Sequence, residues 1–431
     1  MRITFLFIAL FFMNGILSAQ EKYTPTQENL ENREWFRDAK FGLFIHWGIY
    51  SMLGDGEWVL TNKSLNEKEY QQLAAGFYPS RFNAREWVRL AKEAGMKYIC
   101  FTSRHHDGFS MFNTEASDYN VVDATPFKRD VVKELSEACR EEGLKLFLYY
   151  SHIDWHRPDY YPWGRTGRQT GREPAGTWED YLQFMDTQLT ELLTNYGPIG
   201  GIWFDGWWDK PDADWQLERQ YSLIHRLQPG CLIGNNHHKT PFEGEDFQMF
   251  ERDLPGQNTA GYSADAEVSA LPLESCETTN QTWGYSITDR NYKPVKQLIQ
   301  TLVKAAGNNA NLLLNVGPRP SGDFPELAVN TLQEIGKWTA LYGETIYGTR
   351  AGEIAPQPWG VTTRRNDTTF VHILELQASE LFLPIQGKRV KQIVSFKDNT
   401  PVRYKRTKEG ITLYLDTPLT DIDHVIKITW R

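Results

Sequence analysis

The chain is poor in cysteine, with four among 431 residues, at positions 100, 139, 231 and 276. Their wide spacing excludes a disulfide-rich scaffold and does not match the paired spacing of a zinc site. Cys100 and Cys231 lie in apolar, strand-like runs and Cys139 on the apolar face of a helix-like segment. We therefore expect buried free thiols, with one disulfide as the alternative.

Positive charge is also scarce. Lysine and arginine total 46 against 55 aspartates and glutamates, a formal net charge of -9, and no run of three or more consecutive basic residues occurs. This balance argues against a nucleic-acid surface. We expect an uncharged partner.

Long apolar runs are missing except at the start of the chain. Residues 1–19 have a basic start, an apolar stretch and a small-residue end at Ser18-Ala19, which is typical of a secretory signal peptide. At roughly 15 apolar residues the stretch is too short for the ~20 of a spanning helix. We expect an exported protein, periplasmic or extracellular, without a membrane span.

Aromatic residues, by contrast, are abundant at 13%, including 15 Trp and 20 Tyr. Several fall in loop-like stretches, among them Trp155, Trp163, Trp207 and Trp208. Such rings stack on the C–H faces of sugars, but they also serve as large core anchors. Composition alone leaves both interpretations open.

Strand-like and helix-like segments alternate from about residue 40 to 345. The expected strands cover 41–47, 96–102, 144–151, 199–204, 231–234, 247–250 and 311–316. Their continuous apolar character predicts a parallel sheet with helices around it, and no glycine-rich turn of the dinucleotide-binding kind follows the first strand. We expect an α/β fold, a (β/α)8-like TIM barrel, over residues 20–350.

From about residue 356 the pattern changes to short segments that alternate apolar and polar residues between turns. This predicts a small antiparallel β-sandwich over residues 351–431. Because no aromatic cluster stands out there, we expect it to brace the barrel rather than to bind glycan.

Reactive side chains gather where the expected barrel strands end, which is where barrel active sites lie. They are His46 and Trp47; His105, His106 and Asp107; Tyr149, Tyr150 and His152; Trp203 and Asp205; Asn235, His237 and His238; and Glu251. Nearly all are carboxylates, imidazoles or aromatic rings, so this edge is the candidate site.

Asp205 follows the apolar run Gly-Ile-Trp-Phe and precedes Gly206-Trp207-Trp208. It could simply cap the next helix. Glu251, 46 residues later at another strand end, favours a catalytic reading, because sugar hydrolysis needs two carboxyl groups in distinct environments.

The pairs His105-His106 and His237-His238 suggest a metal site as an alternative. Adjacent strand residues point to opposite faces, so such a pair rarely supplies two ligands to one ion. We expect neutral imidazoles that hydrogen-bond substrate hydroxyls, and no metal or other cofactor.

Several motifs occur in one order: FGLFIHWG at 41–48, TSRHHDGF at 102–109, LYYSHIDW at 148–155, GIWFDGWW at 201–208, WGY at 283–285 and NLLLNVGP at 311–318. Together they resemble the α-L-fucosidases of glycoside hydrolase family 29 over roughly residues 30–350. The resemblance implies a retaining exo-hydrolase that removes terminal α-L-fucose from fucosylated glycans through a glycosyl-aspartate intermediate.

By motif, the resemblance implies Asp205 as the nucleophile and a substrate-binding set around it. That set comprises His46, Glu57, Trp58, His105, His106, Tyr149, Trp203, His237 and Trp283. Trp283 is expected against the C5-methyl edge of fucose.

The resemblance leaves two glutamates for the acid/base. Glu251, in QMFERDLPG, matches one family position, with Met249-Phe250 replacing the usual Thr-Pro; Glu274, in LPLESC, matches another, with Leu273 replacing the usual Trp. We favour Glu251 and keep Glu274 as the alternative. An Arg that the family often has near Asn235-Asn236-His237 is missing.

Two further functions stay open. A related retaining exo-glycosidase would act on an α-linked, galactose-like sugar, and a non-catalytic protein would bind fucose without cleaving it. The nucleophile's presence at Asp205 and the expected methyl contact favour the fucosidase.

Overall fold

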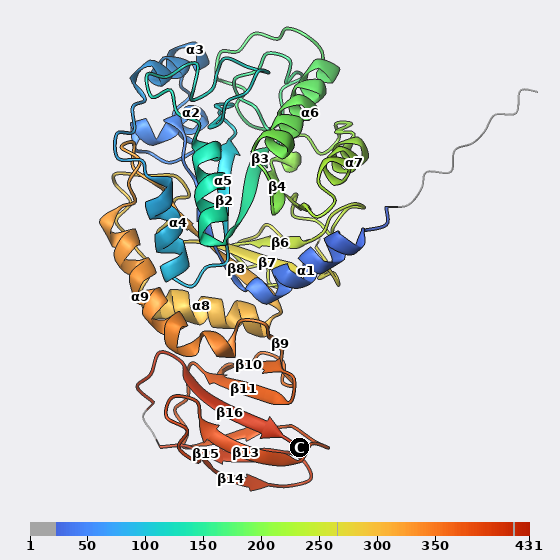
Figure 1. The fold of residues 1–431 in the computed structure, drawn as a ribbon, viewed down its shortest axis with the longest axis vertical. Helices are drawn as coiled ribbons and strands as arrows, with labels where there is room; N and C mark the ends of the chain where they lie inside the picture. Colours follow the sequence, from blue (N-terminus) through green and yellow to red (C-terminus); the bar gives the residue numbers. More distant parts are fainter. Residues whose placement is uncertain (1–22, 265, 417–418) are drawn as a thin grey trace, which may run out of the picture.

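The computed structural model describes residues 23–264, 266–416 and 419–431, which form a barrel followed by two antiparallel sheets (Figure 1). The expected signal peptide at residues 1–19 lies outside the described residues.

The barrel consists of eight parallel strands in the order β5-β4-β3-β2-β1-β8-β7-β6. Their bounds are β1 Phe41–Ile45, β2 Tyr98–Arg104, β3 Lys145–Ser151, β4 Gly201–Asp205, β5 Leu232–Asn236, β6 Gln248–Glu251, β7 Leu273–Thr278 and β8 Ala310–Val316. β5 and β6 are the ends of this order, but the backbone N–H groups of Asp246 and Phe247 both donate to the carbonyl oxygen of Ile233, at 2.7 and 3.3 Å. The barrel is therefore nearly closed, and the expected fold class is confirmed.

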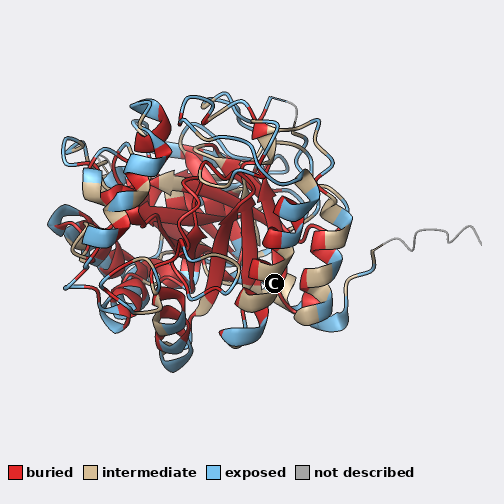
Figure 2. Ribbon diagram, turned by 90° about the horizontal axis from the view of Figure 1, so that it is seen from above, coloured by how far each residue is buried: buried red, intermediate tan, exposed pale blue. Residues whose placement is uncertain are grey.

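Helices cover the outside of the barrel (Figures 1 and 2). They are α1 Gln27–Ala39, α2 Val59–Asn62, α3 Glu67–Tyr70, α4 Ala84–Glu93, α5 Val131–Glu142, α6 Trp178–Asn195, α7 Leu217–Leu227, α8 Val295–Gly307 and α9 Glu326–Tyr342, with short 3-10 turns at Ile49–Leu53, Gln71–Gly76, Trp207–Asp209 and Gly343–Thr345. Among the described residues, the segments between β5 and β6 and between β6 and β7 contain loops and no helix. Both loops begin beside the candidate site.

Local signals account for where the helices begin and end. Asn83 accepts a hydrogen bond from the Glu86 backbone at the start of α4, and Asp130 does the same for α5. Gly143 ends α5 with φ 76°, a left-handed conformation that glycine adopts without penalty. These caps fix where the chain turns back into the next strand.

Alternate strand residues fill the barrel interior, because residues i and i+2 share one face of a strand. Tyr98, Phe147, Trp203 and Met249 are buried there, and Phe36 of α1 packs against them from below. The next inward position along several strands lies at the barrel mouth, which places Asp205 above Trp203.

The C-terminal part is a sandwich of two sheets, in the orders β13-β16-β11-β10-β9 and β12-β15-β14. The strands are β9 Arg350–Ala351, β10 Gly360–Arg365, β11 Thr368–Ile373, β12 Glu380–Leu383, β13 Val390–Ser395, β14 Arg403–Arg406, β15 Ile411–Tyr414 and β16 His424–Trp430. Side chains from both sheets share one core, including Val371, Ile393 and Leu413.

All four cysteines are buried and unpaired. Among the described residues, no helix combines the length and apolarity that crossing a membrane requires.

Candidate active site

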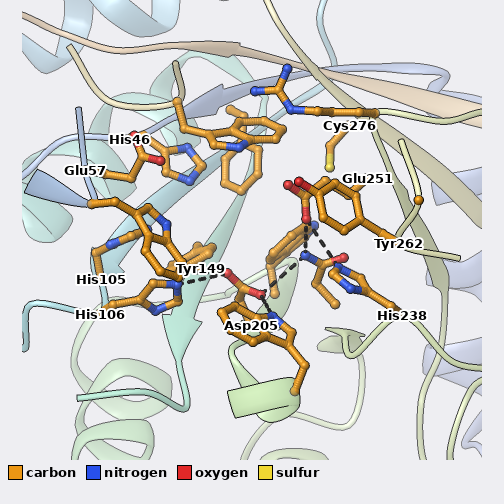
Figure 3. A pocket seen from close by; sticks show the side chains of 18 of the residues that line it. His46, Glu57, His105, His106, Tyr149, Asp205, His238, Glu251, Tyr262 and Cys276 are labelled. Carbon is orange, nitrogen blue, oxygen red and sulfur yellow. Dashed lines mark hydrogen bonds and ion pairs between the residues drawn. The ribbon is translucent and has the colours of Figure 1, made fainter. Parts of the chain in front are cut away.

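A cavity of about 530 Å³ opens at the carboxyl ends of the barrel strands (Figure 3). Its lining comprises Phe44, His46, Glu57, Trp58, His105, His106, Tyr149, Arg165, Trp203, Asp205, Trp208, Asn236, His238, Glu251, Arg252, Gly261, Tyr262, Cys276 and Trp283. A cavity of this size suits a small polar molecule such as a sugar residue.

Asp205, the last residue of β4, has both carboxylate oxygens held by donors. Oδ2 accepts from the Tyr149 hydroxyl at 2.9 Å and lies 3.6 Å from His106 Nε2. Oδ1 accepts from the Gly206 backbone at 2.7 Å and the Trp208 indole at 3.1 Å. These contacts fix the carboxylate toward the cavity, with 13% of the side chain exposed.

Burial raises the pKa of Asp205, and the nearby charge of Glu251 adds to the increase. The hydrogen bonds from Tyr149 and Trp208 act in the opposite direction, because they stabilise the ionised form.

Glu251, the last residue of β6, faces Asp205 across the cavity (Figure 3). Its Oε2 accepts from Asn236 Nδ2 at 2.9 Å and lies 3.3 Å from His238 Nε2. The same Asn236 nitrogen is 3.3 Å from Asp205 Oδ1. One amide group therefore joins the two carboxylates.

Burial alone would raise the pKa of Glu251. The hydrogen bond and charge of His238, the hydrogen bond from Asn236 and the charge of Arg252 outweigh burial and lower this pKa overall. In the structure, Glu251 is thus the carboxyl group that ionises more readily than normal, and Asp205 the one that ionises less readily.

Three imidazoles line the side of the cavity that includes Tyr149. Burial lowers the pKa of His46 to about 4 and the pKa values of His105 and His106 well below their usual range. His46 Nδ1 is 2.7 Å from Asn315 Oδ1, and His106 Nδ1 is 2.7 Å from Ser151 Oγ. These rings are neutral at ordinary pH.

Glu57 and Trp58 lie in the loop after β1 and both line the cavity. The Gly284 backbone donates to Glu57 Oε2 at 2.7 Å. Burial raises the pKa of Glu57. Trp58 packs edge-on against His106 and stacks with Trp208, at centroid distances of 5.4 and 6.0 Å.

An aromatic wall adjoins the three imidazoles. Trp283 lies 5.9 Å from Phe44 and 5.2 Å from His46, and Trp203 lies 5.0 Å from Phe44 between ring centroids. The cavity therefore places an apolar ring surface directly beside its polar imidazoles.

Glu274 lies below the cavity and is not part of its lining. It is 1% exposed and sits on β7, a strand that the sequence did not predict because LPLESCET mixes polar and apolar residues. It accepts hydrogen bonds from the Trp203 indole at 2.8 Å and from the Tyr98 hydroxyl. Burial raises its pKa to about 7.

His237 was expected to contact substrate, but the structure places His238 at the cavity instead. His237 is 2% exposed, and its Nε2 is 3.0 Å from Glu245 Oε1. The chain leaves β5 at Asn236, and His238 has φ 63°. The strand's two-residue alternation stops there, so it does not predict which imidazole turns inward.

Several lining residues were absent from the expected substrate-binding set. They are Phe44, Arg165, Trp208, Asn236, His238, Arg252, Gly261, Tyr262 and Cys276. Phe44 and Asn236 had an available signal, since each is an inward position of a barrel strand. Arg165 and Tyr262 come from long loops, for which the sequence offers no periodicity.

No group of three or more His, Cys, Asp or Glu side chains placed to hold a metal ion occurs within residues 23–264, 266–416 and 419–431. Of the paired histidines, His106, His237 and His238 instead contact oxygen atoms of neighbouring side chains.

The family model described as alpha-L-fucosidase matches residues 10–344. The alpha-L-fucosidase of Dictyostelium discoideum is 29% identical over 455 residues, covering 96% of this chain and 95% of that protein. The human plasma alpha-L-fucosidase is 28% identical over 401 residues, covering 84% and 81%.

Solved structures share the fold. Alpha-L-fucosidase isoenzyme 1 from Paenibacillus thiaminolyticus is 34% identical with a TM-score of 0.83, covering 94% of this chain and all of that one. A GH29 alpha-L-fucosidase from Bacteroides thetaiotaomicron, trapped as a covalent intermediate with 2-fluoro-fucosyl fluoride, is 26% identical with a TM-score of 0.81, covering 93% and 96%. From these matches, the chain belongs to the α-L-fucosidase family, glycoside hydrolase family 29, and is a glycoside hydrolase of that activity.

Proposed function

We propose that the protein is a retaining exo-α-L-fucosidase in which Asp205 is the nucleophile and Glu251 the acid/base. The observation that carries this proposal is the shared Asn236 amide, which contacts Asp205 Oδ1 at 3.3 Å and Glu251 Oε2 at 2.9 Å.

The spacing of the two carboxylates favours retention. Oxygens that share one nitrogen lie no farther apart than two hydrogen-bond lengths. Retaining glycosidases hold their carboxyl groups ~5–5.5 Å apart, whereas inverting enzymes need ~6.5–9.5 Å to admit a water molecule. The Bacteroides relative named above was trapped as a covalent intermediate, which fits the same mechanism.

In the proposed reaction, a carboxylate oxygen of Asp205 attacks the anomeric carbon while Glu251 gives its proton to the leaving oxygen. The resulting ester leaves Asp205 uncharged. Glu251, now ionised, takes a proton from water as the water oxygen attacks the anomeric carbon, and the ester bond breaks. Asp205 and Glu251 thereby return to their starting states.

The imidazoles and the aromatic wall of the cavity support fucose as the sugar. His46, His105 and His106 are neutral and suited to hydrogen-bond hydroxyl groups. The aromatic wall of Phe44 and Trp283 offers the sugar's C5-methyl an apolar contact. A galactose-like sugar has a hydroxymethyl group at this place, which the wall would desolvate without a partner.

The protonation pattern must invert when substrate binds. Catalysis needs Asp205 ionised and Glu251 protonated, whereas the pKa of Asp205 is raised and that of Glu251 lowered in the structure. A sugar in the cavity displaces water from Glu251, and desolvation favours the neutral carboxyl. Developing positive charge at the anomeric carbon favours the ionised form of Asp205.

Glu274 is less suited to acid/base work. Its carboxyl group is engaged by the Trp203 indole and the Tyr98 hydroxyl below the cavity floor. We assign it a positioning role, holding the Trp203 ring against the sugar site.

The test compares hydrolysis of an aryl α-L-fucoside by wild type, Asp205→Ala, Glu251→Ala and Glu274→Ala with and without azide. Azide is expected to restore turnover of Asp205→Ala as the inverted fucosyl azide and of Glu251→Ala as the retained one. If Glu274→Ala gives the retained product instead, the acid/base assignment moves to Glu274.

An aryl α-galactoside serves as the matched substrate for sugar specificity. Faster hydrolysis of the galactoside than of the fucoside by wild type would contradict the fucose assignment.

We further propose that the enzyme acts on fucosylated glycans outside the cytoplasm, on the basis of the signal-like residues 1–19. Fractionation of cells that express the full chain tests this, and activity confined to the cytoplasm would contradict it.

A further inference from the structure

Positive charge is concentrated in one short segment of the sandwich. Residues 386–408 contain eight lysines and arginines and one aspartate, although the whole chain has a formal net charge of -9. Like charges close together repel and lower the stability of a fold. The segment therefore needs an explanation beyond folding.

The fold gathers these residues on one edge of the sandwich. The segment contains β13 and β14, each an edge strand of its own sheet. The Val402 backbone donates to the Ile393 carbonyl at 3.1 Å, and the Arg406 guanidinium donates to the Lys388 carbonyl. We call this surface, residues 386–408, the basic edge; Figure 1 shows β14 at the end of the molecule away from the barrel.

Much of this charge has no carboxylate partner. Lys388 pairs with Glu353 and Lys397 with Asp421. All four residues of β14 are exposed. Within the described part of the chain, no carboxylate lies within ion-pair distance of Arg403, Lys405 or Lys408, the three cations we select for testing.

The basic edge continues onto a face that carries aromatic rings. In the register of the three-stranded sheet, Lys405 pairs with Thr412, and Thr412 with Phe382. Phe382 is 47% exposed. Paired residues project from the same face, so Lys405 and Phe382 lie two strand spacings apart, about 10 Å.

The neighbouring row also contains one cation and one aromatic ring. Arg403 pairs with Tyr414, and its guanidinium lies 6.0 Å from the centre of that ring. Glu380, the acidic residue of this row, is on the other side of Tyr414. The face therefore carries two cations and two rings of the kind that stack on the C–H faces of sugars.

We propose that the basic edge and the adjoining outer face of β12-β15-β14 bind an acidic polysaccharide, one that carries sulfate or carboxylate groups. The exposed, unpaired cations attract the anionic groups, and Phe382 and Tyr414 stack on sugar rings between them. Binding of this kind holds the barrel near acidic glycan, and it needs neither Asp205 nor Glu251.

A glycan accounts for the surface better than other polyanions. Charge alone explains binding to any polyanion, but the exposed ring of Phe382 on the same face as Lys405 is explained by a ligand with both anionic groups and sugar faces. The sequence showed no aromatic cluster here because Phe382 and Tyr414 are separated along the chain and share a face only in the sheet.

The test measures retention of the full chain on immobilised heparin and on polysialic acid, with neutral dextran as the blank. Wild type is expected to bind at low salt and to elute as salt screens the charges. The triple variant Arg403→Gln/Lys405→Gln/Lys408→Gln should bind the acidic glycan with an affinity lowered by up to roughly tenfold. This is the loss expected when three surface ion pairs of ordinary strength are removed. Heparin retention without polysialic acid retention identifies sulfate as the anionic group, and the reverse result identifies carboxylate.

The matched control, Lys133→Gln/Arg226→Gln/Lys296→Gln, removes the same charge from exposed positions on barrel helices. It should bind like wild type. Retention of wild type by neither acidic glycan, or equal weakening in both triple variants, would overturn the proposal.

Phe382→Ala separates glycan binding from general polyanion binding. It should weaken retention on the acidic glycan and leave binding to duplex DNA unchanged. Tighter binding of wild type to duplex DNA than to either glycan would also overturn the glycan assignment. Unchanged hydrolysis of an aryl α-L-fucoside by the variants would show that they are folded.

Discussion

The barrel mouth and the basic edge both concentrate polar side chains, but charged groups are enclosed and hydrogen-bonded at the mouth and exposed at the edge. At the mouth, Asp205 and Glu251 are largely enclosed, and named donors hold each carboxylate. On the basic edge, Arg403 and Lys405 are exposed and have no carboxylate partner among the described residues.

This contrast reflects the cost of burying a charge. An enclosed ion must be compensated by hydrogen bonds or opposite charge, so the mouth has fixed partners and tolerates little change. An exposed ion keeps its hydration and is free to meet an external ligand. Substitutions should therefore affect chemistry at the mouth and affinity at the edge.

Asp205→Asn should have the largest effect. Removal of the nucleophilic oxygen is expected to lower kcat for an aryl α-L-fucoside on the order of 10^4-fold, with the amide still filling the same space. Steady-state kinetics would measure this. The control is Asp212→Asn, which changes an exposed carboxylate in the loop after β4 and should match wild type. A decrease in kcat of less than tenfold for Asp205→Asn would contradict the role of Asp205 as the nucleophile.

Glu251→Gln should lower activity on a fucosylated oligosaccharide by roughly 10^2–10^4-fold, the usual contribution of a general acid. The loss should be smaller for an aryl fucoside whose leaving group departs without a proton. Rates on both substrates would be compared. An equal loss on the two would argue against acid catalysis by this residue.

Glu274→Leu should affect stability more than chemistry. It leaves the Trp203 indole and the Tyr98 hydroxyl without their buried acceptor, at about 1–3 kcal/mol for each unsatisfied group. Thermal or urea unfolding would show the decrease, and Glu274→Gln, which keeps one acceptor oxygen, should lose less. Full stability with abolished activity would instead indicate a chemical role.

His238→Gln should shift the pH dependence of kcat, which reports the substrate-bound enzyme in which Glu251 is the protonated acid. The charge and hydrogen bond of His238 lower the pKa of Glu251, so their removal raises that pKa. The acid then keeps its proton to higher pH, and the alkaline limb moves upward. His237→Gln, whose side chain contacts Glu245 and not Glu251, should leave the limb in place; a downward shift in His238→Gln would refute the sign.

The triple Gln variant of the basic edge should have the smallest effect on the enzyme itself. Exposed substitutions usually change the free energy of unfolding by no more than about 0.5 kcal/mol each. kcat and KM for an aryl fucoside should equal those of wild type. A substantial decrease in kcat would mean that the sandwich and the active site are coupled.

The sequence predicted the elements whose signals are local. α5 and β3 follow from an Asp130 cap, an apolar helix face, Gly143 and a buried run, and the structure places them at Val131–Glu142 and Lys145–Ser151. β7 was not predicted, because a strand that buries Glu274 inside a barrel has no simple apolar pattern. After β5 and after β6 the chain forms loops where a regular strand-helix alternation would place helices.

The candidate site divides in the same way. His46, Tyr149, Trp203 and Asp205 are at inward strand positions, which the two-residue alternation predicts. His238 turns inward only through a left-handed residue beyond β5. Arg165 and Tyr262 reach the cavity from loops whose paths depend on contacts distant in sequence.

The most direct test of the central claim is to trap the enzyme with 2-fluoro-fucosyl fluoride and map the labelled peptide by mass spectrometry. One covalent fucosyl adduct is expected, on Asp205, and it should be absent in Asp205→Asn. An adduct on Glu251, Glu274 or any other side chain would contradict the assignment of Asp205 as the nucleophile.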